Sequence, residues 1–334
     1  MSTTTDTPSV LITGGAGFLG TLLAERLLAA ESFSAGGREF GPVASLTLLD
    51  IFPPRENVAA DSRVNAVVGS IQDNIDALGT YDVIFHLAGV VSGAAEADFD
   101  LGMRTNVDAT RALLEHARGY VTPAVVVFAS SLAVYGADPA IGPVGEVDDD
   151  TLPRPQSSYG VQKFIGEQLV ADYSRKGFID GRTVRLMTVS VRPGRPNAAA
   201  SSFMSGIIRE PLAGETAPCP VAPETSIALS SPRLTIDGIV VAAAVDAATW
   251  GSRTAMNLPA LTTTPREMAQ AMDRVTGTDR SSLIEWGHDA AVAGIVESWP
   301  SRFTTARAAS LGLNPAGNFD EIVAEYVSTV PVSA

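Results

Sequence analysis

The chain has 334 residues, of which 46% are hydrophobic and 18% are charged. This composition is typical of a folded globular protein and excludes a disordered or collagen-like chain. The 37 acidic residues outnumber the 23 lysines and arginines, and the resulting net charge of −14 disfavours nucleic acid as a partner. A single cysteine allows no intrachain disulfide and no cysteine zinc cluster, and three histidines argue against a multi-histidine metal site.

The sequence contains no run of about 18 uncharged apolar residues, so no segment is expected to span a membrane. Residues 1–8 are polar and rich in threonine, with no basic stretch ahead of the first apolar run. We therefore expect no signal peptide and a cytoplasmic protein.

Short apolar runs alternate with helical patterns along the first part of the chain. These runs lack a polar face, which is typical of strands in a parallel sheet that helices cover on both sides. The sequence therefore predicts an α/β fold with a doubly wound parallel sheet. In chain order, the patterns predict a strand at 10–12, a helix at 21–30, a long loop at 31–45, strands at 46–50, 64–69 and 81–87, a helix at 105–119, a strand at 124–129, a helix at 158–176 and a strand at 183–191.

The alternation weakens from about residue 195, where proline, serine and threonine become frequent. We interpret residues 1–195 as one domain and residues 196–334 as a smaller mixed α/β lobe. Segments such as 234–250 are expected to pack back onto the first domain.

Three glycines, Gly14, Gly17 and Gly20, separate the first strand from the first helix. They let the backbone approach a pyrophosphate, and the helix directs its free N–H groups and positive end at the anion. Asp50 ends the next predicted strand. The order of strand, glycine turn, helix and acidic strand end favours a dinucleotide site over a plain turn. The Asp50 carboxylate suits a ribose hydroxyl and repels a 2′-phosphate, which predicts NAD, although Arg55 leaves NADP open.

Tyr159 and Lys163 are four residues apart, which places them on one face of the predicted helix. An ammonium beside a phenol lowers the pKa of the tyrosine, so that it can act as an acid or base near neutral pH. Ser131 follows the strand at 124–129, at the sheet edge where ligands of parallel sheets bind. Together the three side chains predict a proton-transfer site, although each alone has a plain reading as a surface or turn residue.

The motifs at 13–20, 82–89, 131–136 and 159–163, together with Asn106, resemble those of the extended short-chain dehydrogenase/reductases, also called the NAD-dependent epimerase/dehydratase family. The resemblance implies a Rossmann-type NAD-binding domain and a small C-terminal lobe that binds the substrate. It also implies roles for the three polar residues. Tyr159 is the general base or acid, Lys163 bonds the nicotinamide ribose, and Ser131 polarises the substrate oxygen.

The cofactor contacts implied by the resemblance fall on the glycine loop, on strand ends and on the catalytic pair. His86, in the motif at 82–89, is expected to be structural, and Asn106 is expected to position the backbone. The implied contacts are Gly14, Gly17, Phe18, Leu19, Gly20, Asp50, Ser70, Ile71, Leu87, Ala88, Gly89, Asn106, Tyr159 and Lys163.

The chain departs from the family pattern at three places. Ser70 stands where many members have an acid near the adenine, although the backbone of Ile71 could serve there. Thr188 stands where nucleotide-sugar epimerases have an asparagine, and the step at 233–237 lacks the usual histidine. These differences weaken the case for a nucleotide-sugar substrate.

Within the family, the segments at 191–197, 231–233 and 298–303 resemble dehydrogenases of four-carbon sugar acids. This resemblance implies NAD-dependent oxidation of the C2 hydroxyl to a 2-oxo acid. A sugar acid needs cationic or hydroxyl partners for its carboxylate. The candidate substrate residues are Ser92, Ser131, Tyr159, Arg192 and Arg233, although a structural ion pair is an equal reading of either arginine.

Two alternatives remain at this point. One is a nucleotide-sugar 4-epimerase or dehydratase with tightly bound NAD, although no Asp-Glu pair follows Ser131 as a dehydratase would need. The other is a non-catalytic NAD-binding regulatory protein, which the intact Ser131, Tyr159 and Lys163 disfavour. The resemblance also leads us to expect a homodimer formed through the helices at 105–119 and 158–176.

Overall fold

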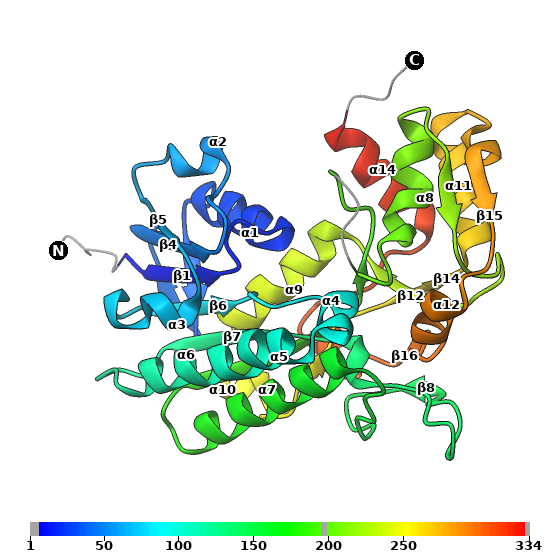
Figure 1. Ribbon diagram of the computed structural model, residues 1–334. Coiled ribbons are helices and arrows are strands. Elements are labelled where there is room, and N and C mark those ends of the chain that lie inside the picture. The colour runs from blue at the N-terminus through cyan, green and yellow to red at the C-terminus, as the bar shows by residue number, and fades with distance from the viewer. Residues whose placement is uncertain (1–6, 195–198, 331–334) are drawn as a thin grey trace.

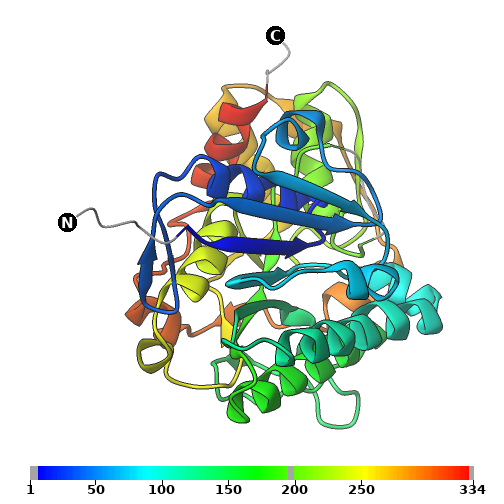
Figure 2. The same ribbon diagram turned by 90° about the vertical axis from the view of Figure 1, so that its left-hand side faces the viewer.

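The computed structural model describes residues 7–194 and 199–330. Seven strands form the main sheet, in the order β13-β9-β7-β6-β1-β4-β5, and every neighbouring pair is parallel (Figures 1 and 2). The predicted α/β fold with a parallel sheet is confirmed. The strands are β1 (Ser9–Thr13), β4 (Ser45–Asp50), β5 (Val64–Val68), β6 (Val83–His86), β7 (Val125–Ser131), β9 (Asp180–Leu186) and β13 (Met256–Asn257).

Helices cover both faces of this sheet (Figure 1). One face carries α1 (Phe18–Leu28) and α9 (Pro232–Ala244). The opposite face carries α3 (Ile71–Asn74), α6 (Ala109–Arg118) and α7 (Ser158–Arg175). This doubly wound arrangement buries the sheet on both sides, which explains why its strands read as continuous apolar runs.

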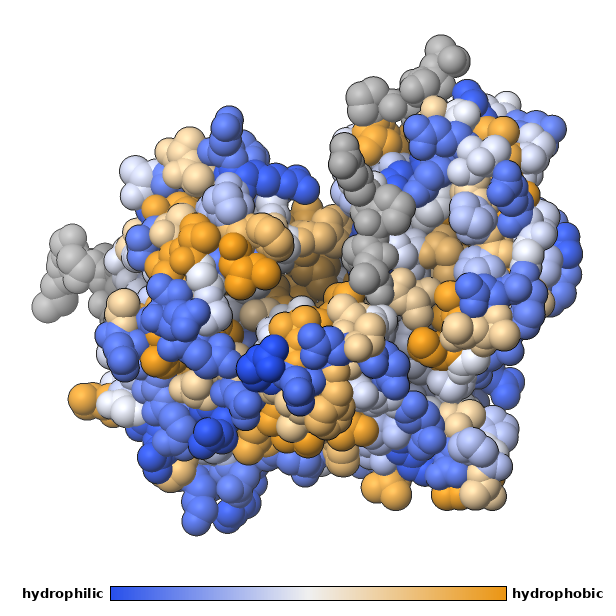
Figure 3. Space-filling model, in the orientation of Figure 1, coloured by the Kyte–Doolittle hydropathy of each residue, from blue (hydrophilic) through white to orange (hydrophobic). Residues whose placement is uncertain are grey.

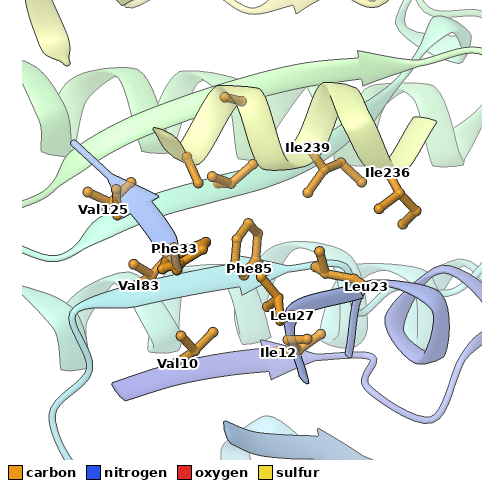
Figure 4. Packing of buried hydrophobic residues seen from close by; sticks show 14 of the residues in the cluster. Val10, Ile12, Leu23, Leu27, Phe33, Val83, Phe85, Val125, Ile236 and Ile239 are labelled. Atoms are coloured by element: carbon orange, nitrogen blue, oxygen red, sulfur yellow. The ribbon is translucent and has the colours of Figure 1, made fainter. Parts of the chain in front are cut away.

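The core under α1 and α9 joins segments that are far apart in the sequence. Figure 4 shows Phe85 of β6 between Leu23 of α1 and Ile236 and Ile239 of α9. Phe33 meets Phe85 edge to face, with 6.5 Å between the ring centroids. Because α9 follows β9 by more than 40 residues, the later half of the chain completes the core of the earlier half.

The structure differs from the predicted elements in three places. The predicted loop at 31–45 contains a hairpin of β2 (Phe33–Ala35) and β3 (Arg38–Phe40), whose turn glycines have φ of 57° and 76°. The predicted strand at 183–191 is divided into β9 and β10 (Thr188–Val189). The helix expected at 105–119 begins as a π-helix at Met103–Asp108 and continues as α6.

A second hydrophobic cluster lies in the later part of the chain. It is built mainly from helices α8 (Phe203–Leu212), α11 (Pro265–Thr276) and α14 (Phe319–Thr329). Two small sheets belong to this part of the chain. They join β10 with β12 (Ile227–Ser230) and β14 (Leu261–Thr263), and β11 (Ala217–Cys219) with β15 (Ile284–Trp286).

The predicted domain boundary at 195/196 lies outside the described residues and stays a prediction.

Within residues 7–194 and 199–330, no helix is long and apolar enough to cross a membrane. The remaining elements are α2 (Glu56–Ala59), η1 (Ile75–Ala77), α4 (Ser92–Ala97), α5 (Phe99–Gly102), η3 (Leu132–Val134), β8 (Glu146–Val147), α10 (Ala247–Trp250), η4 (Arg280–Leu283), α12 (Ala290–Val296), β16 (Arg302–Phe303) and α13 (Ala306–Ser310).

Candidate active site

A cleft of about 290 Å³ opens at the carboxyl edge of the main sheet, and Figure 3 shows the molecule hollowed between α1 and α8. This is the edge where parallel α/β sheets bind their ligands. The cleft brings together most of the sequence-predicted site residues. Those that line it are Gly14, Gly17, Phe18, Leu19, Gly20, Leu87, Gly89, Ser92, Ser131, Tyr159, Lys163 and Arg192.

The glycine loop forms one end of the cleft. Gly14 has a φ of 74°, and a side chain at Gly20 would overlap the carbonyl oxygen of Gly14. Helix α1 starts at Phe18 after Gly17, which offers no side-chain cap for the first turn. The N–H groups of that turn therefore remain available to an anion in the cleft.

Asp50 ends β4 beside this loop. Its carboxylate accepts hydrogen bonds from the backbone N–H of Ala16, at 3.1 Å, and from that of Phe52, at 3.1 Å. The acid thus ties the glycine loop to the neighbouring strand end. It does not line the cleft cavity itself but lies next to it.

Two other predicted cofactor residues, Ser70 and Asn106, use their side chains in hydrogen bonds within the protein. The Ser70 hydroxyl caps α3 by accepting from the N–H of Asp73 at 3.1 Å, and Ile71 is buried. The buried Asn106 accepts from the N–H of Val90 at 2.8 Å and donates to its carbonyl at 3.1 Å. Asn106 therefore fixes the backbone after β6, next to Ala88, whose N–H lies 3.4 Å from Thr13 Oγ1.

Close packing of α7 against the end of β7 brings Ser131 and Tyr159 into the same cleft. Helix α7 is capped by Ser157, whose hydroxyl accepts from the N–H of Gly160 at 3.2 Å. A side chain at Gly160 would overlap the carbonyl oxygen of Ala133, in the turn that follows Ser131. Only glycine at this position allows the helix to start so near the strand end.

Lys163 is almost fully buried behind Tyr159. Its Nζ donates to the carbonyl oxygen of Ala129 at 2.8 Å and lies 4.9 Å from the centroid of the Phe128 ring. Burial lowers the pKa of Lys163 to about 8, while the charge of Glu167 acts in the opposite direction. The ammonium is thus held in place by the strand backbone.

The pKa of Tyr159 moves in the direction opposite to the one predicted from the sequence. Burial raises the pKa of its phenol, and hydrogen bonding with Ser131 and the charge of Arg192 act to lower it. The Lys163 Nζ bonds the Ala129 carbonyl and lies 5.8 Å from the centroid of the tyrosine ring. Ser131 and Arg192, rather than Lys163, are therefore the groups that favour the phenolate here.

His86 lies outside the cleft lining, between two hydroxyl groups. Its Nδ1 is 2.6 Å from Thr13 Oγ1, and its Nε2 is 2.8 Å from Thr110 Oγ1. Burial and the nearby charge of Lys163 lower the pKa of His86 to about 3. The imidazole is therefore neutral at physiological pH and joins β1, β6 and α6.

Arg192 is a cation that lines the same cleft as Tyr159, and the charges of the two side chains influence each other. It is half-buried, and the nearby cation Arg209 donates to its carbonyl oxygen at 2.8 Å. Arg209 is paired with Glu210 at 2.5 Å. Over residues 7–194 and 199–330, no acidic side chain forms an ion pair with Arg192, whose pKa is lowered by burial and by Arg209. A guanidinium so placed suits an anionic group of a ligand.

The two candidate arginines have different surroundings. Arg233 lies near the start of α9 with 63% of its side chain exposed. It pairs with Asp237 at 3.3 Å and with Glu325 at 3.7 Å, and it lines a separate cavity. The structure does not bring Arg233 together with Ser131 and Tyr159. Residues 195–197 of the segment at 191–197 lie outside the described residues.

Sequence reasoning missed further residues of the cleft. Met187 and Ser201 line it together with Thr188 and Trp299. The buried Ser92, which was predicted, begins α4 and lines the cleft as well. Met187 lies in the break between β9 and β10, and Ser201 lies in a turn before α8, so no motif or periodic pattern marks either residue.

Residues 10–226 match the NAD dependent epimerase/dehydratase family. The chain belongs to this family. It is accordingly an NAD-dependent oxidoreductase that acts on CH–OH groups, and NAD is its cofactor.

Three relatives illustrate the likeness. The chain is 49% identical to the D-erythronate dehydrogenase of Cupriavidus necator, with 96% of this chain and 98% of the relative covered. It is 40% identical to the D-erythronate dehydrogenase of Haemophilus influenzae, with 95% and 98% covered. A solved nucleoside-diphosphate-sugar epimerase from Agrobacterium tumefaciens is 37% identical, with a TM-score of 0.85 and 97% and 94% covered.

Proposed function

We propose that this family member is an NAD-dependent dehydrogenase that oxidises the C2 hydroxyl of D-erythronate to the 2-oxo acid. The observation that carries the proposal is Arg192, a half-buried cation without an acidic partner in the described chain, in the same cleft as Ser131 and Tyr159. A small sugar acid presents a carboxylate next to the hydroxyl that reacts. The carboxylate would bond Arg192, and Ser92 would add a hydroxyl contact.

The cleft residues divide the chemistry between them. Ser131 and Tyr159 hold the C2 hydroxyl, and the Tyr159 phenolate takes its proton as the C2 hydrogen leaves as a hydride. NAD⁺, when it is bound, supplies the acceptor for this hydride and thereby takes up the two electrons that C2 loses. Lys163 would bond the nicotinamide ribose when NAD⁺ is bound, and its hydrogen bond to the Ala129 carbonyl holds the ammonium in place.

The predicted cofactor residues suit this arrangement. The open N–H groups of Phe18, Leu19 and Gly20 in the first turn of α1 would hold the pyrophosphate, and Asp50 would accept from a ribose hydroxyl. Ser70 and Ile71 would lie at the adenine, and Leu87, Ala88 and Gly89 would face the middle of the dinucleotide. Asn106 would act through the backbone of Val90.

A nucleotide-sugar epimerase is the second candidate, because the Agrobacterium structure carries that description at 37% identity. An epimerase returns the hydride to its substrate, so it yields no net NADH. The dehydrogenase is favoured by the two relatives at 49% and 40% identity, which carry the same name over nearly the full length.

The test is absorbance of NADH with purified protein, NAD⁺ and a panel of four- to six-carbon sugar acids. D-erythronate is expected to give NADH, and the longer acids little. Turnover of UDP- or dTDP-sugars without net NADH would replace the dehydrogenase by the epimerase. Binding of NAD without any turnover would favour a regulatory protein.

The two arginines provide a matched pair of variants. Arg192→Gln is expected to raise the KM for D-erythronate about 10–100-fold, because a charge-assisted hydrogen bond contributes about 1.5–3 kcal/mol. Arg233→Gln removes an exposed ion pair outside the cleft and should leave KM within about twofold. Steady-state kinetics of both variants decide whether Arg192 binds the carboxylate; equal effects would contradict the assignment.

We also propose a homodimer in which α6 and α7 pack against the same helices of a second copy. Phe99 and Val161 are exposed apolar side chains on this side of the molecule, in α5 and α7. Light scattering measures the molar mass of the purified protein in solution. A molar mass that corresponds to one chain would contradict the homodimer.

A further inference from the structure

A buried ion pair lies directly beneath the cleft and has no part in the chemistry described so far. Glu167, on α7 one turn after Lys163, has 2% of its side chain exposed, and Arg185 on β9 has 4%. The Arg185 Nε donates to Glu167 Oε1 at 2.9 Å and Nη2 to Oε2 at 2.7 Å. The pair is therefore bidentate and almost completely removed from solvent.

Further polar side chains anchor this pair. Arg185 Nη1 donates to the hydroxyl of Tyr135 at 2.5 Å, and that hydroxyl donates to Asn257 Oδ1 at 3.1 Å. Tyr135 and Asn257 are fully buried as well. Removing such charges from water costs free energy that their attraction often does not recover, so stability alone is a weak reason to keep the pair.

The pair is coupled to the cleft through three consecutive residues of β7. The Ala129 carbonyl accepts from Lys163, and the Ser130 hydroxyl donates to Glu167 Oε1 at 2.5 Å. The next residue, Ser131, faces the cleft. One turn of α7 is thus fastened to β7 at two successive residues, immediately before the serine of the proposed reaction.

The negative charge of the Glu167 carboxylate also acts on Lys163. Of the groups near Lys163, His86 on β6 is neutral and Tyr159 lies one turn earlier on α7, while Arg185 on β9 is ion-paired with Glu167. In the described chain, Glu167 is the carboxylate that favours the protonated ammonium of Lys163 against its burial. The positive charge of Arg192 acts on Tyr159.

We propose that Glu167, oriented by Arg185, is a positioning residue that holds Ser130 and the turn of α7 that carries Lys163, so that Lys163, Tyr159 and Ser131 keep one working geometry. The role in turnover rests on the proposed function, whereas the effect on Lys163 does not. Because NAD is the cofactor and Lys163 is expected to bond its ribose, NAD⁺ binding reports the state of Lys163 without any substrate.

The experiment compares Glu167→Gln with the double variant Glu167→Met, Arg185→Met. The first keeps the shape and removes the charge. The second replaces both charges by apolar side chains, so that no unpaired Arg185 is left to unfold the protein. Asp180→Asn is the matched control, because it breaks the ion pair of the fully buried Arg182 at the other end of β9.

The dissociation constant of NAD⁺ is measured by tryptophan fluorescence between pH 6 and 10, beside kcat/KM for D-erythronate. In Glu167→Gln, the pH at which NAD⁺ binding weakens is expected to fall by about one unit, and the alkaline limb of kcat/KM to fall with it. The double variant removes two opposite charges together, so a smaller fall in the same direction is expected. The control should keep the wild-type midpoint. A wild-type midpoint in both folded Glu167 variants would overturn the proposal.

Failure of the proposed function has a different signature. If the wild-type protein binds NAD⁺ but makes no NADH from D-erythronate, the substrate assignment fails. The pH dependence of NAD⁺ binding still decides the role of Glu167 in that case.

Discussion

At the scale of single residues, Tyr159 is the side chain that the proposed reaction needs most, because its phenol lies beside Ser131 in the cleft. The variant Tyr159→Phe keeps the ring and removes the proton acceptor. Turnover is expected to fall about 10²–10⁴-fold, the usual contribution of a positioned acid or base. The dissociation constant of NAD⁺ should change little, since Lys163 keeps its bond to Ala129. A variant with full turnover would contradict the assignment.

His86 predicts a dependence of stability on pH. Its pKa is lowered to about 3 in the folded protein, from 6.5 in the unfolded chain. Below pH 6.5 the unfolded chain takes up a proton that the folded protein does not, so the free energy of unfolding decreases as the pH falls. Between pH 7 and 5 this one group accounts for about 2 kcal/mol.

The measurement is urea unfolding of the wild-type protein and of His86→Gln at pH 7 and pH 5. The variant replaces the titrating ring by an amide that can still bond Thr13 or Thr110. Its loss of stability on acidification should be smaller by about 2 kcal/mol. Equal losses in the two proteins would show that the imidazole is accessible to protons in the folded state.

The sequence predicted the cleft residues unequally well. The glycine loop, Ser131, Tyr159 and Lys163 follow from local spacing next to a strand or helix, and the structure brings all of them into one cleft. The direction of the Tyr159 pKa was predicted wrongly, because four-residue spacing does not reveal that Lys163 bonds Ala129 instead of the phenol. Arg192 and Arg233 looked equivalent, since their separation in space is not encoded locally.

At the scale of elements, the start of α7 depends on Gly160. In Gly160→Ala the added methyl would meet the Ala133 carbonyl, which would push Tyr159 away from Ser131. The gain in helix propensity, about 1 kcal/mol, is smaller than the cost of overpacking, about 1–3 kcal/mol. We therefore expect lower stability and lower turnover, measured by thermal unfolding and NADH formation.

Gly79→Ala is the matched control for this variant. A side chain at Gly79 would meet no atom within 4 Å. The stability and the turnover of Gly79→Ala should equal those of the wild-type protein. If Gly160→Ala behaved in the same way, the close packing of α7 against β7 would not matter for the site.

Elements with strong local patterns were predicted, and weakly marked ones were not. The apolar strands β1, β4 and β7 have long continuous runs, and the structure places them within a few residues of the predicted ranges. The hairpin of β2 and β3 has only three residues per strand, although its Gly36-Gly37 turn was a usable signal. Strand β13 has two residues and gains its place only by pairing with β9.

At the scale of the whole molecule, the later half of the chain completes the main sheet. Ile236, Ile239, Met256 and Leu258 are buried in the same core as β1 and β6. Burial of four such side chains contributes roughly 6–12 kcal/mol, comparable to the entire stability of a typical domain, roughly 5–15 kcal/mol.

A fragment of residues 1–195 is therefore expected to lack cooperative unfolding and NAD binding, although the sequence marks it as one domain. Calorimetry and NAD⁺ titration of the fragment check this prediction. Cooperative unfolding of the fragment with NAD⁺ bound would mean that α9 and β13 are dispensable to the first domain.

Helix α9 follows most strands of the main sheet in the sequence, and this order has a consequence during synthesis on the ribosome. The end of β9 at Leu186 and the end of α9 at Ala244 are 58 residues apart. At roughly 5–20 residues per second, about 3–12 s pass between the emergence of the two segments. During that interval the apolar face of the nascent sheet around Phe85 and Val127 has no α9 to cover it. The growing chain therefore presents a binding surface for chaperones that the finished protein no longer has.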